Sequence, residues 1–196
     1  MYLSLVFILK TMLTSPFPQL SKKAEKKITF FLIFSTIIVG FFMIVLDSFL
    51  TNETCKHGII SFELTNNLDS SKAIISSWDI QSKISAGISL GLDFLFLILY
   101  SSLIALLIHK LNKKLWTNRS FYSIGVVIIF GQFLAGIFDA IENIGLIQLL
   151  LGNLSQFWVS LAYYFAFTKF IIISISFLYI IINFIFLLIK KSTKNE

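Results

Sequence analysis

Four long apolar runs dominate the pattern of hydrophobic and polar positions along the chain. They cover residues 28–50, 86–108, 121–151 and 157–189, and each is long enough for a helix to cross a hydrocarbon core of about 30 Å, which takes roughly 20 residues. The runs are continuously apolar and lack the alternation of a barrel strand, so helices are the spanning structure that fits them. The pattern predicts an all-α integral membrane four-helix bundle, with residues 1–196 forming a single membrane domain.

Composition agrees with this prediction. Of the 196 residues, 57% are hydrophobic and only 13% are charged, and the mean hydropathy is +0.88. Soluble domains have about 45–50% apolar and about 25% charged residues, so a soluble globular fold is excluded. The formal net charge of +6 does not indicate a nucleic-acid binder, because the basic residues lie in a few clusters between apolar runs. We expect no nucleic-acid partner.

The basic residues predict the orientation of the four spans. Three groups, within residues 10–27, 110–119 and 190–194, hold 12 of the 16 lysines and arginines. Basic residues stay on the cytoplasmic side of a membrane protein, so both termini are expected to be cytoplasmic and the protein to lie in the cell's inner membrane. The loop of residues 51–85 is then outside.

The segment before the first span, residues 1–27, is predicted to be cytoplasmic or interfacial. Tyr2 to Leu9 is apolar but too short to span, and it lacks the cleavage site of a secretory signal, so an interfacial helix is the favoured interpretation. A start at Met12 is the alternative. The role of residues 1–14 is left open.

The outer loop, residues 51–85, is the only sizeable polar region. Ser70 and Ser71 precede an apolar stretch that ends at Trp78, a pattern that predicts a capped short extracytoplasmic helix with one apolar face. Cys55 is the sole cysteine of the chain. The neighbouring Lys56 and His57 would favour a reactive thiolate, but a metal site needs more ligands than this loop offers, so we expect no metal and no cofactor.

Polar residues inside the four runs recur on one face of each helix. In the first three runs they follow the spacing i, i+4, i+7, i+11, and in the fourth the spacing i, i+7, i+14. We expect these stripes to face one another inside the bundle while Phe, Ile and Leu face lipid. The four stripes are Thr36, Gly40, Met43 and Asp47; Ser89, Asp93, Phe96 and Tyr100; Gln132, Gly136, Asp139 and Asn143; and Lys169, Ser176 and Asn183.

Charged residues on these stripes define a candidate site. A rise of 1.5 Å per residue places the acids and the lysine in the outer half of the bundle, with Asp47 nearest the surface. Ionisable groups in a bilayer are costly and usually pair, face the interior or mark a functional path. The interpretations left open are a structural ion pair, interfacial snorkelling groups, a ligand or ion site, and acid–base catalysis. The predicted ligand-binding residues are Asp93, Tyr100, Asp139, Glu142, Asn143 and Lys169.

Four segments resemble a loosely defined set of uncharacterised small bacterial four-helix integral membrane proteins. The resemblance implies a four-span fold with an Asp, Glu-Asn and Lys constellation, and it implies no activity. Sterol isomerases and sigma-2-type membrane proteins are similar in architecture only. The segments are Ser61 to Leu64 with Trp78, Leu90 to Phe96 with Tyr100, Asp139 to Asn143, and Lys169 with Phe170.

Three function hypotheses follow. The first is binding of a small ligand, lipid or ion in the polar cluster. The second is a structural or assembly subunit of a larger membrane complex, as a homo-oligomer or with a membrane partner. The third is an intramembrane enzyme acting on lipid, which is disfavoured because the chain has no G-x-S-x-G elbow, H-E-x-x-H zinc helix or Gly-rich phosphate loop. No catalytic residue is assigned, and membrane lipids are the expected surroundings.

Overall fold

The structure is a computed structural model that describes residues 14–17, 20–117 and 121–192. Within this part of the chain it contains helices and no strands. The expected interfacial helix at residues 2–9 lies outside the described residues. Four helices are long: α2 (Lys22–Asp47), α5 (Ile80–Leu115), α6 (Tyr122–Leu150) and α7 (Gln156–Ser192). Two are short: α3 (Ile59–Glu63) and α4 (Leu68–Ser77).

The four long helices are each long and apolar enough to cross a membrane, so the described residues confirm an all-helical fold with four candidate spans. Three of them are longer than the apolar runs that predicted them: α5 begins at Ile80 instead of residue 86 and ends at Leu115 instead of residue 108. Hydropathy marks only the apolar part of a helix. Polar ends continue the helix wherever a helix former follows, because backbone hydrogen bonding does not require an apolar side chain.

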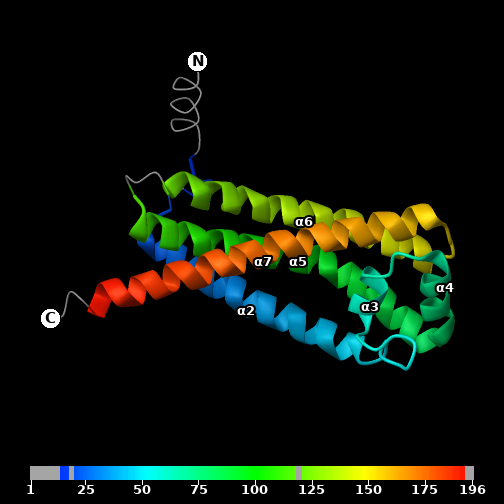
Figure 1. Cartoon of the computed structure of the whole chain (residues 1–196). Coiled ribbons are helices and arrows are strands. Elements are labelled where there is room, and N and C mark those ends of the chain that lie inside the picture. Colours follow the sequence, from blue (N-terminus) through cyan, green and yellow to red (C-terminus); the bar gives the residue numbers. More distant parts are fainter. Residues whose placement is uncertain (1–13, 18–19, 118–120, 193–196) are drawn as a thin grey trace, which may run out of the picture.

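Helix α5 is the centre of the bundle. It packs against α2, α6 and α7, while α6 packs most extensively against α7. Figure 1 shows the four long helices running along one common axis, with α3 and α4 together at one end and the start of α2 and the last turns of α7 at the other. We call these the loop end and the terminal end. Helix α2 packs mainly on α5, which leaves much of its surface exposed.

Local sequence sets the helix boundaries at the loop end. The Asp79 carboxylate caps α5 by accepting a hydrogen bond from the Ser82 backbone N–H at 2.8 Å, and this bond lowers the pKa of that carboxyl. Helix α6 ends in a Schellman motif: Gly152 has φ +94°, and the Asn153 N–H donates to the Gln148 carbonyl at 2.9 Å. The tight turn that follows brings α7 back antiparallel to α6.

The loop between α2 and α5 packs onto the bundle through aromatic side chains. Trp78 is buried, its indole N–H donates to the Leu50 carbonyl at 2.9 Å, and its ring meets Phe62 edge-on at 5.3 Å between centroids. The sequence predicted one helix here, and the structure has two. Helix α4 is capped by Asn67, not by Ser70, because the Asn67 side chain accepts from the Asp69 and Ser70 N–H groups. The side of the membrane on which this loop lies stays a prediction.

Gly58 is held in a conformation that other residues rarely adopt. Its φ is +54°, and an added Cβ would lie 2.1 Å from Asp47 Oδ1, the atom that accepts the Ile59 N–H at 2.6 Å. We expect Gly58→Ala to lower the free energy of unfolding by about 1–3 kcal/mol, because strain and the lost hydrogen bond add. Thermal unfolding in detergent tests this against Gly91→Ala, which has open space. Equal midpoints would contradict the expectation.

Cys55 is a packed residue of the loop. Its side chain is fully buried, and its Sγ lies 3.0 Å from the Gly58 carbonyl oxygen as a hydrogen-bond donor. Burial raises the pKa of the thiol. We therefore expect Cys55 to resist maleimide at neutral pH and to react after denaturation in SDS, as read by mass spectrometry. Fast labelling of the folded protein would show that the loop opens.

A group of polar side chains joins α2 to α5 at the terminal end. Glu25 is buried and accepts from Lys113 Nζ at 2.8 Å, and the ring of His109 lies 2.7 Å from Ser15 Oγ through Nδ1. The Phe17 ring packs beside His109 at 5.6 Å between centroids. These contacts attach the start of α2 to the bundle at the end away from α3 and α4.

Glycines set how closely the long helices approach. Gly136 of α6 lies against Ser101 of α5, as expected from its place on the polar stripe, whereas an added Cβ at Gly91 would meet nothing within 4 Å. Gly91 is therefore not a point of close contact between helices. A Cβ at Gly125 would lie 2.5 Å from the Asn112 side chain of α5, and at Gly145 it would lie 3.2 Å from the backbone carbonyl oxygen of Trp158 in α7.

Candidate functional site

Lys169 of α7 is at the centre of a buried cluster of charged side chains. Its Nζ lies 2.6 Å from Asp139 Oδ1, 2.7 Å from Glu142 Oε2 and 3.7 Å from Glu63 Oε2. Asp139 and Glu142 share one face of α6 because they are three residues apart. All four side chains are buried in the bundle. The ion pair that the sequence left open as an interpretation is present in the structure, and Lys169 contacts both Asp139 and Glu142.

One hydrogen bond joins Tyr100 to this cluster, and a second pairs the other two predicted residues, Asn143 and Asp93, beside it. The Tyr100 hydroxyl donates to Asp139 Oδ2 at 2.9 Å, and Asn143 Nδ2 donates to Asp93 Oδ2 at 2.7 Å. Both donors and both acceptors are buried. The structure thus brings together all six residues that the sequence singled out, from α5, α6 and α7.

Glu63 is a site residue that sequence reasoning assigned only to the outer loop. The short helix α3 projects it into the bundle, where burial raises the pKa of its carboxyl against the opposing attraction of Lys169. The signal was local: Glu63 is the lone acid in an otherwise apolar stretch, and Phe62 beside it belongs to the core. Glu63 and Lys169 are 106 residues apart in the sequence, so no local spacing predicted that they would pair.

Asp47 does not join the cluster, which corrects the expectation that its level in α2 would bring it there. Its Oδ1 accepts the Ile59 N–H instead, in the turn that starts α3. The reason is geometric, since Asp47 is the last residue of α2 and the chain folds back over it. Asp47 therefore organises the loop.

The remaining stripe residues of α7 hold the helices together between the cluster and the terminal end. Ser176 accepts a hydrogen bond from Gln132 of α6, and Asn183 Oδ1 accepts from the Trp116 indole N–H at 2.5 Å. Both α7 side chains are buried, so the predicted stripe at i, i+7, i+14 faces the bundle interior. These two contacts are structural.

The lengths of α6 and α7 exclude the interpretation that Lys169 is an interfacial snorkelling group. Helix α6 continues to Leu150 and α7 begins at Gln156, so Lys169 lies about 20 Å along α7 from its first residue. The lysine is 95% buried, whereas a snorkelling lysine has its ammonium in water. The charged groups are inside the bundle.

Comparisons of the chain with protein-family models, with curated proteins and with solved structures find no match. Function is therefore argued from the geometry of the site.

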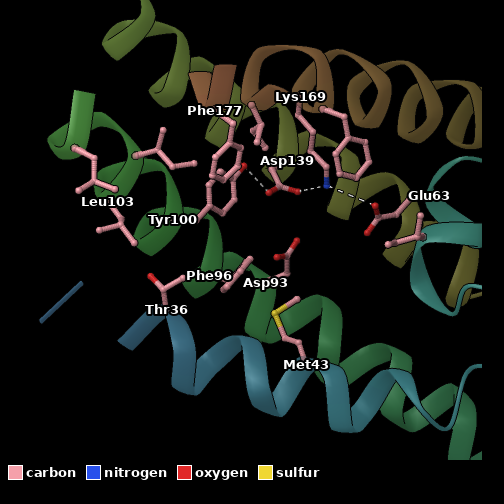
Figure 2. A pocket seen from close by; sticks show the side chains of 15 residues that line it. Thr36, Met43, Glu63, Asp93, Phe96, Tyr100, Leu103, Asp139, Lys169 and Phe177 are labelled. Atoms are coloured by element: carbon pink, nitrogen blue, oxygen red, sulfur yellow. Dashed lines mark hydrogen bonds and ion pairs between the residues drawn. The ribbon is translucent and has the colours of Figure 1, made fainter. Parts of the chain in front are cut away.

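A pocket of about 470 Å³ ends on this cluster. It lies between α2, α5 and α7 and is lined at the loop end by Ile60 and Glu63 of α3. Figure 2 shows Asp93 and Asp139 pointing into the same space from opposite sides, with Lys169 and Tyr100 flanking Asp139. Thr36 and Met43 of α2 form the wall opposite α7. We call this the α2–α7 pocket.

The rest of the pocket wall is apolar. It continues from the charged end toward the terminal end along Leu103 and Leu107 of α5 and Ile173 and Phe177 of α7. In the described part of the chain, no group of three or more His, Cys, Asp or Glu side chains is arranged to hold a metal ion. The Lys169 ammonium occupies the position between three carboxylates where a bound cation would otherwise lie. The arrangement thus offers a hydrophobic cavity with one charged end.

Proposed function

We propose that this protein is a multi-pass membrane protein that binds a small amphipathic molecule in the α2–α7 pocket. The observation that carries the proposal is a cavity of about 470 Å³ whose long apolar wall ends on buried Asp93, Asp139 and Lys169. Small-molecule sites are commonly cavities of about 300–1,000 Å³, mostly apolar with a few converging polar groups.

The energetic cost of the cluster supports a function beyond packing. Removing carboxylates from water is expensive, and a buried ion pair is often no more stabilising than well-packed apolar residues of similar volume. Here α6 and α7 already pack closely through Gly145, and Gln132 and Ser176 supply an interhelical hydrogen bond. Three buried acids contact one lysine, and a fourth buried acid, Asp93, has no ion pair among the described residues, which is a costly way only to hold helices together.

The proposed orientation places the charged end of the pocket on the outer side of the plasma membrane, with both termini in the cytoplasm. The lysine-rich terminal end supports this assignment. In a Cys55→Ala background, Glu53→Cys introduces an exposed thiol in the loop. We expect a membrane-impermeant maleimide to label it in intact cells. Labelling only after lysis would reverse the orientation.

Photocrosslinking tests the binding proposal. Dodecyl chains with a diazirine near their tail end, bearing an ammonium, hydroxyl or carboxylate head, are added to the protein in nanodiscs. We expect at least one probe to label pocket residues of α5 and α7, identified by peptide mass spectrometry. Saturation with rising probe concentration distinguishes a site from bulk lipid contact.

A matched pair of variants controls this experiment. Ile173→Trp fills the pocket, whereas Ile175→Trp adds the same bulk to an exposed face of the same helix. The first is expected to suppress pocket labelling and the second to leave it unchanged. Labelling spread evenly over the exposed faces of all four helices, and unaffected by Ile173→Trp, would overturn the proposed function.

A further inference from the structure

The charged end of the α2–α7 pocket presents mainly hydrogen-bond acceptors. Lys169 Nζ faces three carboxylates, the Tyr100 hydroxyl donates to Asp139, and Asn143 Nδ2 donates to Asp93. The Lys169 ammonium donates to Asp139 and contacts two further acids as ion pairs, and the single O–H of Tyr100 is used. Among the polar groups that line the pocket, the Thr36 hydroxyl has no hydrogen-bond partner within the described part of the chain. A ligand head that donates hydrogen bonds therefore fits this end better than one that only accepts them.

Asp93 is the carboxylate left with capacity to accept them. Its Oδ2 accepts from Asn143, whereas among the described residues nothing donates to Oδ1 and no cationic side chain lies within ion-pair distance. The residue is 93% buried yet lines the pocket, and Figure 2 shows its carboxylate directed into the cavity. It is a nearly buried, half-partnered acid that points at the space where a ligand head would lie.

The charge balance gives the sign of the ligand. Glu63, Asp139 and Glu142 share the single positive charge of Lys169, and Asp93 has no positive partner among the described residues. An anionic head would find no free cationic partner here, because the one ammonium already contacts three acids. A cationic head would supply the partner that Asp93 lacks.

The walls beside Asp93 suit an organic cation. Phe96 and Tyr100 line the pocket on α5, with ring centroids 5.6 Å apart, and aromatic faces attract ammonium groups. From Asp93 to Leu107 the pocket-lining part of α5 rises about 20 Å, which leaves room for an apolar chain directed toward the terminal end.

We infer that the ligand of the α2–α7 pocket is an amphipathic organic amine whose ammonium head pairs with Asp93 and whose apolar chain lies along α5 toward Leu107. This inference rests on the proposed function and specifies its ligand class. It also assigns Asp93 as the residue that selects the charge of the head.

The three dodecyl probes test the inference through competition with one another in nanodiscs, corrected for partition into protein-free nanodiscs. We expect the ammonium probe to bind at least about tenfold more tightly than the alcohol, because a charge-assisted contact in a buried site contributes more than one tenfold step. The carboxylate probe is expected to bind more weakly than both. The diazirine at the tail end of the ammonium probe should label residues near Leu107 and Phe177.

Asp93→Asn separates charge selection from general binding. It keeps an acceptor for Asn143 but removes the negative charge, so it should abolish the preference for ammonium over alcohol while pocket labelling persists. Asp93→Glu keeps the charge and should retain the preference, and Glu53→Gln removes an exposed acid and should change nothing. If Asp93→Asn fails to fold, the head-group order of the wild-type protein still decides the question.

The outcomes distinguish the two proposals. Pocket labelling that saturates equally with all three heads, or favours carboxylate, would overturn the amine inference and leave the proposed function standing. The absence of saturable pocket labelling by every probe would overturn both. An ammonium preference unchanged in the folded Asp93→Asn protein would overturn the assignment to Asp93.

Discussion

Replacing Lys169 with methionine is expected to lower the free energy of unfolding by about 3–5 kcal/mol, the cost of leaving buried charges without their partner. The ammonium is within 4 Å of Glu63, Asp139 and Glu142, and its removal leaves three mutually repelling carboxylates inside the bundle. Methionine has a similar unbranched shape, so lost packing contributes little. Unfolding by SDS in mixed micelles measures the change.

Two further variants make this test specific. Lys72→Met removes the lysine of an exposed ion pair with Asp69, 3.9 Å apart, and should change stability by less than about 1 kcal/mol. Adding Asp139→Asn and Glu142→Gln to Lys169→Met should restore a large part of the lost free energy of unfolding, because the amides that replace the two acids carry no charge. If Lys169→Met unfolds like the wild-type protein, the cluster does not contain ionised groups in the folded state.

Replacing Gly145 with leucine is expected to destabilise the bundle by about 1–3 kcal/mol or more, since a side chain would be forced into a close helix contact. Even a Cβ at this position would lie 3.1 Å from Leu161 Cδ2 and 3.2 Å from the Trp158 carbonyl oxygen. The carbonyl belongs to the α7 backbone, so relief requires α6 and α7 to separate. SDS unfolding measures the change in stability.

Gly91→Leu is the matched control for this substitution. Gly91 is also in the middle of a long helix, but its added Cβ would have open space, so leucine should be tolerated or slightly stabilising. Comparable losses in the two variants would mean that the cost lies in helix insertion and not in the contact between α6 and α7.

The four helices were predictable because the signal for a membrane span is local. Each apolar run is decided by the cost of taking its own backbone and side chains out of water, which requires no knowledge of the other helices. The ends were less predictable. Helix α5 begins at its Asp79 cap, outside the apolar run, and α4 begins at Asn67 because that side chain, and not Ser70, reaches the free N–H groups.

The candidate site was predictable in part because each of its members interrupts an apolar helix at a helical spacing. Polar groups in such a setting must turn away from lipid, so Asp93, Asp139 and Lys169 had to converge in the interior. Their partners were not determined in this way. Glu63 reaches Lys169 only because α3 folds over the end of the bundle, and Asp47 leaves the cluster because the same turn uses its carboxylate to hold Ile59.

By itself the sequence determined that four helices form, that each has one polar face, and that these faces are hidden together, because hydrophobic periodicity along a single helix contains that information. Only the tertiary structure decided that α2 packs on α5 apart from α7, that a cavity lies between them, and that Asp93 points into it half-partnered. Those features depend on how helices distant in sequence approach one another. That approach is set by close contacts such as the one at Gly145, which no single segment specifies.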